Sequence, residues 1–217
     1  MEVRAVGRRG QRLIVLSDGS DLLVSEEALA RVPISEGEAA EPERLQALAD
    51  ADRRVAAHDS ALHLLSYRAR SETEMRKRLA LRGVDTCIAE GEIDRLRTAG
   101  LLDDEKFARA WVEDRKRLAP RGRRMLRYEL LGRGIEPKCV EAAVSEVDDR
   151  ATAVELARAR ARRILCSDYV SFSTRVTGFL LRRGFDHDVA TEATRLAWAE
   201  VAGDTGPEAP LRPTTEA

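Results

Sequence analysis

The sequence predicts a mainly α-helical protein, in which three tandem three-helix repeats form an elongated array behind a small N-terminal module rich in β-hairpins. Three observations support this fold class. The 217 residues are dominated by Ala, Leu, Arg and Glu and only 4% are aromatic, a composition typical of helices. One short motif recurs three times at intervals of about fifty residues. Segments with strand character occur only near the N-terminus.

The N-terminal module is expected to contain three short strands and one short helix. Apolar segments are separated by turn-type sequences, and Asp18-Gly19 is a strong hairpin signal. A helix over 25–32 would be capped by Ser25, and an acidic connector follows at 33–43. We therefore expect a weakly docked module, such that a chain starting near Ala49 would still fold. The expected strands are 2–6, 12–16 and 21–25.

The recurring motif has the chemistry of a helix end followed by a helix start. It reads RLALRGV at 78–84, ELLGRGI at 129–135 and FLLRRGF at 179–185. A glycine just past the last turn can take the left-handed conformation that ends a helix, and the apolar residue after it packs on the leucine five positions earlier. The acid that comes next can cap the following helix. Gly83, Gly134 and Gly184 are thus predicted to be structural turns.

Helical stretches are also expected upstream of each motif, at about 53–69, 103–118 and 149–166. The predicted organisation has five parts. They are a β-rich module at 1–48, helical repeats at 49–101, 102–148 and 149–202, and a disordered tail at 203–217 that is rich in proline.

Several classes of protein are disfavoured. The sequence has no apolar run long enough to span a membrane and no signal-peptide pattern, so we expect a cytoplasmic protein. Its three cysteines fit neither a disulfide framework nor a zinc site. Phosphate-binding loops, dinucleotide fingerprints and nucleophile elbows are missing, and Asp103-Asp104 is better explained as a helix start than as a catalytic pair. We therefore expect no enzyme activity, no cofactor and no metal.

Positive charge is concentrated in one stretch of a nearly neutral chain. The net charge is −1, but residues 115–133 contain eight basic residues and one acid, Glu129. Such segregation predicts a local anionic partner rather than general polyanion binding.

The same stretch contains an unusual helix start. Ser71 begins a capping box, SETE, in the first repeat, and Ser171 is the expected cap in the third. The second repeat has Gly122 there, flanked by arginines and without an acid. Free N–H groups beside arginines would form an anion site, although a solvated helix face would give the same pattern. The candidates are Arg115, Lys116, Arg117, Arg121, Arg123, Arg124 and Arg127, with Tyr128 either stacking on a base or packing at the rim of the core.

Three stretches resemble the RecX family of RecA recombinase regulators. They are SETEMRKRLALRGV (71–84), which adds Arg76 and Lys77 to the candidates, LRTAGLLDDEKFARAWV (96–112) and RGRRMLRYELLGRGI (121–135). Gly100, Leu102, Asp103, Phe107 and Ala108 fall where the family signature places them. Arg123 and Met125 depart from it, since proline and a basic residue are frequent there.

The resemblance implies a non-catalytic helical protein that binds the RecA–DNA filament and restrains filament growth, ATP hydrolysis and strand exchange. The expected partners are the RecA filament and single-stranded DNA, with double-stranded DNA as a further candidate; we expect no membrane contact and a monomer. Two alternatives stay open from the residues. One is a stand-alone DNA-binding helical protein, and the other is a protein-only adaptor.

Overall fold

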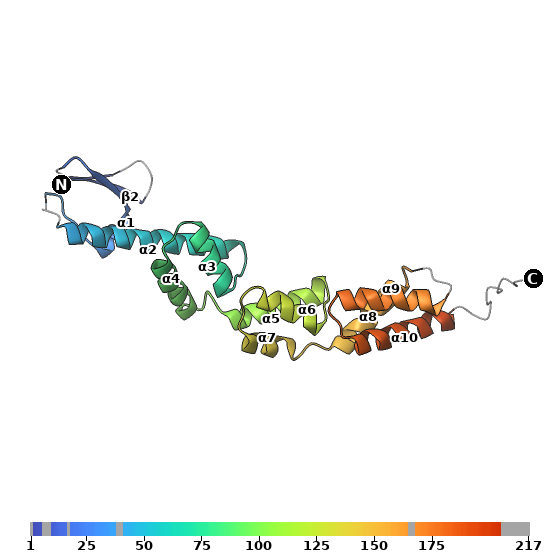
Figure 1. Ribbon diagram of the computed structural model, residues 1–217. Coiled ribbons are helices and arrows are strands. Elements are labelled where there is room, and N and C mark those ends of the chain that lie inside the picture. Colours follow the sequence, from blue (N-terminus) through green and yellow to red (C-terminus); the bar gives the residue numbers. More distant parts are fainter. Residues whose placement is uncertain (1, 6–9, 17, 38–40, 165–167, 205–217) are drawn as a thin grey trace, which may run out of the picture. The chain divides into compact units, whose positions relative to one another are not determined.

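The computed structural model describes residues 2–5, 10–16, 18–37, 41–164 and 168–204, and these residues are mainly helical, as predicted (Figure 1). The chain divides into two compact units, Met1–Asp104 and Glu105–Ala217, which are considered separately. The strands are β1 Glu2–Ala5, β2 Gln11–Val15 and β3 Asp21–Ser25. The helices are α1 Glu26–Arg31, α2 Pro42–Tyr67, α3 Glu72–Leu81, α4 Thr86–Thr98, α5 Asp104–Leu118, α6 Arg123–Leu131, α7 Pro137–Val144, α8 Asp149–Ala161, α9 Tyr169–Arg182 and α10 His187–Asp204.

The three predicted strands form one antiparallel sheet in the order β1-β2-β3. At the β2–β3 turn Gly19 has a φ of +84°, which favours glycine. The Asp18 carboxylate accepts a hydrogen bond from the Ser20 N–H at 2.9 Å. Ser25 then caps α1 by accepting from the Ala28 N–H at 3.1 Å. The Ser25 cap and the three predicted strands are therefore confirmed, with the second strand one residue earlier than expected. Val6, the last residue of the first predicted strand, lies outside the described residues.

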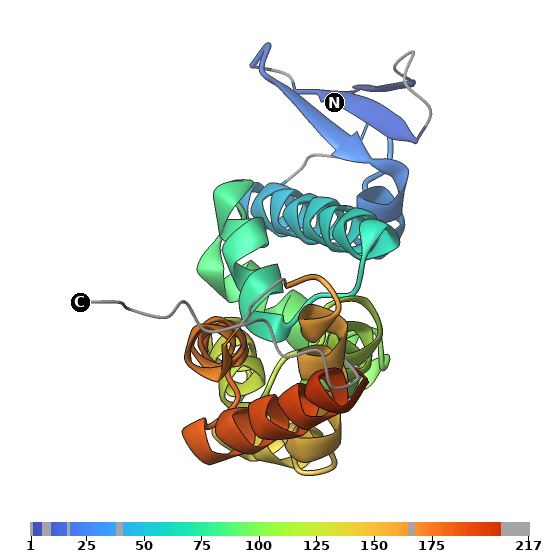
Figure 2. The ribbon, with the colours of Figure 1, turned by 90° about the vertical axis from the view of Figure 1, so that its right-hand side faces the viewer.

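The N-terminal module shares its hydrophobic core with the first long helix. Helix α2 begins at Pro42, well before the expected start near residue 53, and the expected boundary between 48 and 49 lies inside it. The Ser25 N–H also donates to the Asp52 carboxylate at 2.7 Å. Figure 2 shows the sheet lying beside α2 with α1 next to it. The shared core consists of Ile14, Val24, Ala28, Leu48, Ala51 and Val55, so the module is docked through a core rather than loosely attached.

Each of the three helical repeats has its own core. Helices α2, α3 and α4 enclose a cluster that includes Met75, Leu79 and Ile93. Helices α5, α6 and α7 enclose one around Leu126 and Leu130. The third cluster, which includes Phe172, Leu180 and Phe185, lies among α8, α9 and α10.

The helix ends have the predicted geometry. Gly83, Gly134 and Gly184 have φ values of +77°, +75° and +87°. The N–H of the next residue bonds back to the leucine carbonyl five positions earlier. These bonds are Val84 to Leu79 at 3.1 Å, Ile135 to Leu130 at 3.3 Å and Phe185 to Leu180 at 3.3 Å. Together they form the expected helix-ending motif.

The helix starts follow the sequence less closely. Asp85 caps α4 as predicted, accepting from the Cys87 N–H at 2.8 Å. Glu136 precedes Pro137 at the start of α7 but makes no side-chain cap bond. The expectation for Ser171 is wrong, because Asp168 is the cap of α9 and accepts from the Ser171 N–H at 2.8 Å. Ser171 is therefore the residue that donates its N–H to the cap.

Some predictions fall outside the part of the chain that the structure describes. Helix α8 ends at Ala161, before the expected 166, and residues 165–167, including Cys166, are not described. Of the predicted tail, only Gly203 and Asp204 are described, as the end of α10. Among the described helices, none is both long and apolar enough to cross a membrane.

Candidate nucleic-acid interface

The start of α6, where the sequence predicts a free anion site, is occupied by a carboxylate of the chain itself. Gly122 provides no side-chain cap and the first turn contains no acid. The Arg123 N–H nevertheless donates to Asp149 Oδ1 at 3.0 Å and to Oδ2 at 3.3 Å. Asp149 is the first residue of α8, in the next repeat, and burial raises the pKa of its carboxyl group. The helix start therefore belongs to the contact between the second and third repeats.

Gly122 itself is required by a close approach of two main chains. Its N–H donates to the Arg183 carbonyl at 2.9 Å. A Cβ at position 122 would lie 2.6 Å from the Phe185 nitrogen and nearer still to the Gly184 carbonyl. A Cβ at position 184 would in turn lie 2.5 Å from the Met125 nitrogen. We call this contact the Gly122–Gly184 joint, and it explains why the second repeat has no serine at its cap.

The first repeat contains the same carboxylate contact, which the sequence reading missed. Asp104, the first residue of α5, accepts a hydrogen bond from the Glu72 N–H at the start of α3, at 2.9 Å. Asp104 and Asp149 are each the second residue of an Asp-Asp pair. In the later pair, Asp148 caps its own helix by accepting from the Ala151 N–H at 3.0 Å. The repeated Asp-Asp pair was a signal in the sequence. One acid caps its own helix, and the other accepts a hydrogen bond from the start of a helix in the preceding repeat.

Glu129, the one acid of the basic stretch, interacts with several side chains of the second repeat. Its Oε2 accepts from Arg115 Nε at 2.7 Å and from Trp111 Nε1 at 2.8 Å. Arg121 Nε lies 3.9 Å from its Oε1. The Arg133 guanidinium stacks over the Trp111 ring at 3.6 Å, a favourable cation–π distance. Arg115 is thus held within the second repeat, whereas Arg121 Nε lies near the same carboxylate without a hydrogen bond to it.

Other candidate arginines also have partners in the chain. Arg127 binds Glu141 through two hydrogen bonds of 2.7 and 2.9 Å, which lower the pKa of the Glu141 carboxyl. Arg123 Nε donates to the Val147 carbonyl at 2.7 Å. Arg117 forms an exposed pair with Asp114 at 3.2 Å. In the first unit, Arg76 is held by Glu90 in the same two-bond geometry as Arg127.

A smaller set of candidates faces outward with its charge available. Arg124 is exposed and donates to the Leu181 carbonyl at 3.1 Å, and no carboxylate of the described residues pairs with it. Lys116, in unit two, is exposed, and among the described residues it has no ion-pair partner; Lys77 in unit one is likewise exposed. Tyr128 is 76% exposed, so it does not pack at the rim of the core. Arg124 and Tyr128 lie one turn apart on α6 and share a face.

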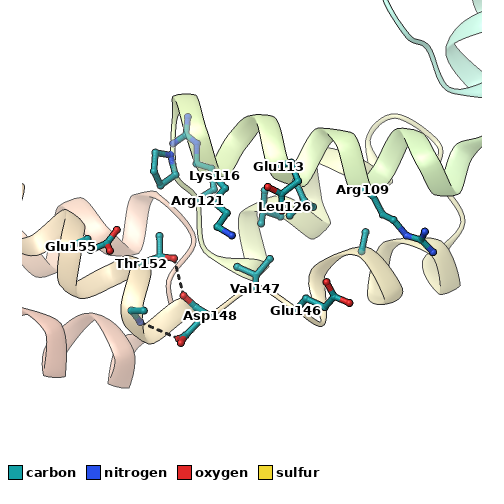
Figure 3. Close-up of a pocket in the computed structure, with 14 residues that line it drawn as sticks. Arg109, Glu113, Lys116, Arg121, Leu126, Glu146, Val147, Asp148, Thr152 and Glu155 are labelled. Atoms are coloured by element: carbon teal, nitrogen blue, oxygen red, sulfur yellow. Dashed lines mark hydrogen bonds between the residues drawn. The ribbon is translucent and has the colours of Figure 1, made fainter.

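A hollow of about 420 Å³ opens in the second unit beside Lys116 (Figure 3). Lys116 and Arg121 line it from the α5–α6 side, and the segment Glu146–Asp148 lines the opposite side. Counting Arg109, Glu113 and Glu155, its charged lining has three bases and four acids. This hollow is therefore unsuited to a phosphate. The anion-binding candidates are the exposed residues Arg117 and Arg124, together with Lys116, which is exposed as well as lining the hollow.

Comparison with known proteins identifies the family. Models of the first and second three-helix domains of RecX match residues 57–96 and 103–144. A regulatory protein RecX from Mycobacterium sp. strain KMS is 33% identical over 160 residues, covering 70% of this chain and 86% of the relative. One from Mycobacterium avium strain 104 is 34% identical, covering 66% and 83%.

Solved structures agree on the fold. A crystal structure of regulatory protein RecX superposes with a TM-score of 0.70 at 24% identity, covering 89% of this chain and 97% of the other. The RecX structure from Lactobacillus salivarius gives a TM-score of 0.63 at 22% identity, covering 69% and 99%. The predicted resemblance is confirmed, and the chain belongs to the RecX family.

Proposed function

We propose that this protein regulates the RecA recombinase by binding the RecA–DNA filament and restraining its growth, ATP hydrolysis and strand exchange. Membership of a family of regulatory proteins carries the proposal. The three separate helical cores support it, because they present long helix surfaces to a partner.

We further propose that the second repeat contacts DNA phosphates through Lys116, Arg117 and Arg124. All three are exposed, and a phosphate can replace the weak exposed Arg117–Asp114 pair. Tyr128 would offer its exposed ring to an unpaired base. Arg115, Arg123 and Arg127 have a positioning role, since each is hydrogen-bonded to a carboxylate or carbonyl of the chain. Arg121 lies 3.9 Å from Glu129 and lines the acid-rich hollow, so we do not count it among the phosphate contacts.

The DNA-dependent ATPase of the cognate RecA, measured with and without this protein, tests the regulatory function. We expect the rate of ATP hydrolysis to fall as the protein is added. An unchanged rate over a wide concentration range would overturn the proposal, and a rise would reverse the direction of regulation.

The contact surface is tested by reversing two charges, Lys116→Glu with Arg124→Glu. Three phosphate contacts predict a slope of about −2 for log K against log salt with single-stranded DNA, and the double variant should remove most of it. The control is Arg175→Glu with Arg195→Glu, two exposed arginines of the third repeat. Equal losses in both variants would mean that binding follows overall charge rather than this surface.

Two further outcomes distinguish the alternatives. If the protein inhibits RecA but shows no affinity for DNA at low salt, it is a protein-only adaptor. If it protects one sequence in a footprinting experiment without RecA, it is a stand-alone DNA-binding protein.

A further inference from the structure

A hollow in the first unit is lined mainly by basic side chains, whereas the hollow in the second unit is lined by more acids than bases. The hollow in the first unit measures about 550 Å³ and lies among α1, α2 and α4. Three arginines line it, one from each helix: Arg31, Arg54 and Arg95. The lining also includes one acid, Glu92. Arg31 belongs to a stretch, residues 1–52, that has more acids than bases, so charge counting there gave no sign of a basic site.

The single acid of this hollow is already engaged. Glu92 is only 6% exposed, and its Oε1 lies 2.7 Å from His58 Nδ1. Arg95 is 3.9 Å from the other carboxylate oxygen, which is beyond hydrogen-bonding distance. The carboxylate therefore turns toward the helix interface, and the arginines keep most of their charge for a ligand.

The three guanidinium groups are free to bind or only weakly held. Arg31 pairs with Glu27 one turn away in its own helix, where both side chains are substantially exposed; such pairs are weak and easily exchanged. Arg54 is exposed, and among the described residues it forms no ion pair or hydrogen bond. Arginine is the side chain best suited to bidentate binding of phosphate oxygens.

Gly91 is a second, independent indication of a ligand. It lies inside α4 and lines the hollow. Glycine weakens a helix interior, and a Cβ at this position would meet nothing within 4 Å. Packing within the chain therefore gives no reason for a glycine here. Its absent side chain leaves the helix backbone open to close approach by a molecule in the hollow.

The basic lining extends along the groove between α2 and α4. A neighbouring hollow of about 190 Å³ shares Ile88 with the first, and its charged lining consists of Arg53, Arg82 and one acid, Asp85. The Asp85 carboxylate is engaged in capping α4. A row of arginines along a groove fits a ligand with regularly repeated negative charges better than it fits a single ion. Nucleic acid has this property, because each nucleotide adds a phosphate.

We propose that the α1–α2–α4 hollow, with Arg31, Arg54 and Arg95, is a second nucleic-acid site that binds consecutive backbone phosphates of single-stranded DNA. Arg31 belongs to the N-terminal module, which shares a core with α2. The module thus acquires a function: it supplies one wall of this site. The inference rests on the proposed function only in taking DNA as the ligand, and it requires no contact with RecA.

The test uses the full-length protein and a fluorescent oligothymidylate, without RecA. The variant is Arg54→Glu, and the matched control is Arg78→Glu, which reverses an exposed arginine of α3 in the same unit. We expect Arg54→Glu to weaken binding about tenfold at low salt and to reduce the salt slope by about 0.7, the value for one phosphate contact with a single strand. The control should change both little. Far-ultraviolet circular dichroism checks that both variants are folded.

A second variant, Gly91→Leu, fills the hollow without changing charge and should also weaken binding. Equal affinities for wild type, Arg54→Glu and Gly91→Leu would overturn the proposal. Unchanged DNA binding with lost inhibition of RecA would overturn it too, since the hollow would then bind an acidic protein segment. Weakened DNA binding supports the inference even if the protein has no effect on the RecA ATPase, so the two proposals fail separately.

Discussion

The starts of α3 and α6 are equivalent positions in two repeats, and they are completed in different ways. At α3, the Ser71 hydroxyl accepts from the Glu74 N–H at 3.1 Å, and Asp104 accepts from the Glu72 N–H. At α6, Asp149 provides the matching carboxylate. The place of the serine is taken by Gly122, whose N–H binds the Arg183 carbonyl of the following repeat.

The difference shows that a helix start can lack a capping side chain because another main chain packs closely against it. A glycine among arginines at a helix start has the sequence pattern of an anion site. Here the glycine admits another main chain, and the nearest anion is an aspartate of the same protein. The candidate phosphate contacts are accordingly exposed side chains of α5 and of the first turn of α6, rather than the N–H groups of that helix start.

The largest expected effect on stability is that of Gly184→Ala, which we compare with Gly83→Ala. Both glycines have positive φ, but a Cβ at 184 meets Met125 whereas one at 83 meets nothing within 4 Å. We expect about 4 kcal/mol of destabilisation at 184, from strain and overlap together, and about 1–2 kcal/mol at 83, from strain alone. Urea unfolding measures both. Equal losses would show that the main chains at 122 and 184 are not in close contact.

Exchanging the caps themselves gives the next largest effect. Gly122→Ser installs the residue of the first repeat, and we expect a loss of about 3 kcal/mol because the new Cβ overlaps the Gly184 carbonyl. The reverse exchange, Ser71→Gly, removes one cap bond and should cost about 1 kcal/mol. A stabilised Gly122→Ser protein would restore the idea that the α6 start lacks only a cap.

Asp149 allows the carboxylate contact to be separated from the glycine contact. Asp149→Ala leaves the Arg123 N–H without its acceptor, and we expect a loss of about 2 kcal/mol. Asp149→Asn keeps an acceptor oxygen and removes a charge whose burial is unfavourable, so it should cost less than half as much. Thermal unfolding of the two variants provides the measurement. A larger loss for the asparagine variant would mean that the charge itself is needed.

The smallest effect on stability is expected for a substitution of Arg127. This variant tests whether an arginine with a positioning role differs from one that contacts DNA. Its pair with Glu141 is largely exposed, with side-chain exposures of 40% and 58%. We expect Arg127→Gln to lower stability by about 0.5 kcal/mol and to leave the affinity for single-stranded DNA unchanged. An affinity loss as large as that of Lys116→Glu would place Arg127 among the contacts.

The helix ends were predictable because their cause is local. Leu130, Gly134 and Ile135 are near neighbours in the sequence, and their spacing alone specifies the turn that the structure contains. The α6 start was not predictable in this way, because its partners, Asp149 and Gly184, come from later in the chain. Glu129 was visible as one acid, but only the fold shows that it binds Arg115 and Trp111 at once and lies close to Arg121. The start of α2 was missed because its first turns pack on the sheet.

The Gly122–Gly184 joint limits how freely the repeats could be exchanged by shuffling or by design. Its two halves lie in different repeats, and each lacks a side chain on account of the other. A chimaera that replaced the second repeat with a copy of the first would bring Ser71 opposite Gly184 and obstruct the joint. The repeats share a pattern of helices and turns, yet we expect the second and third to be exchangeable only as a pair.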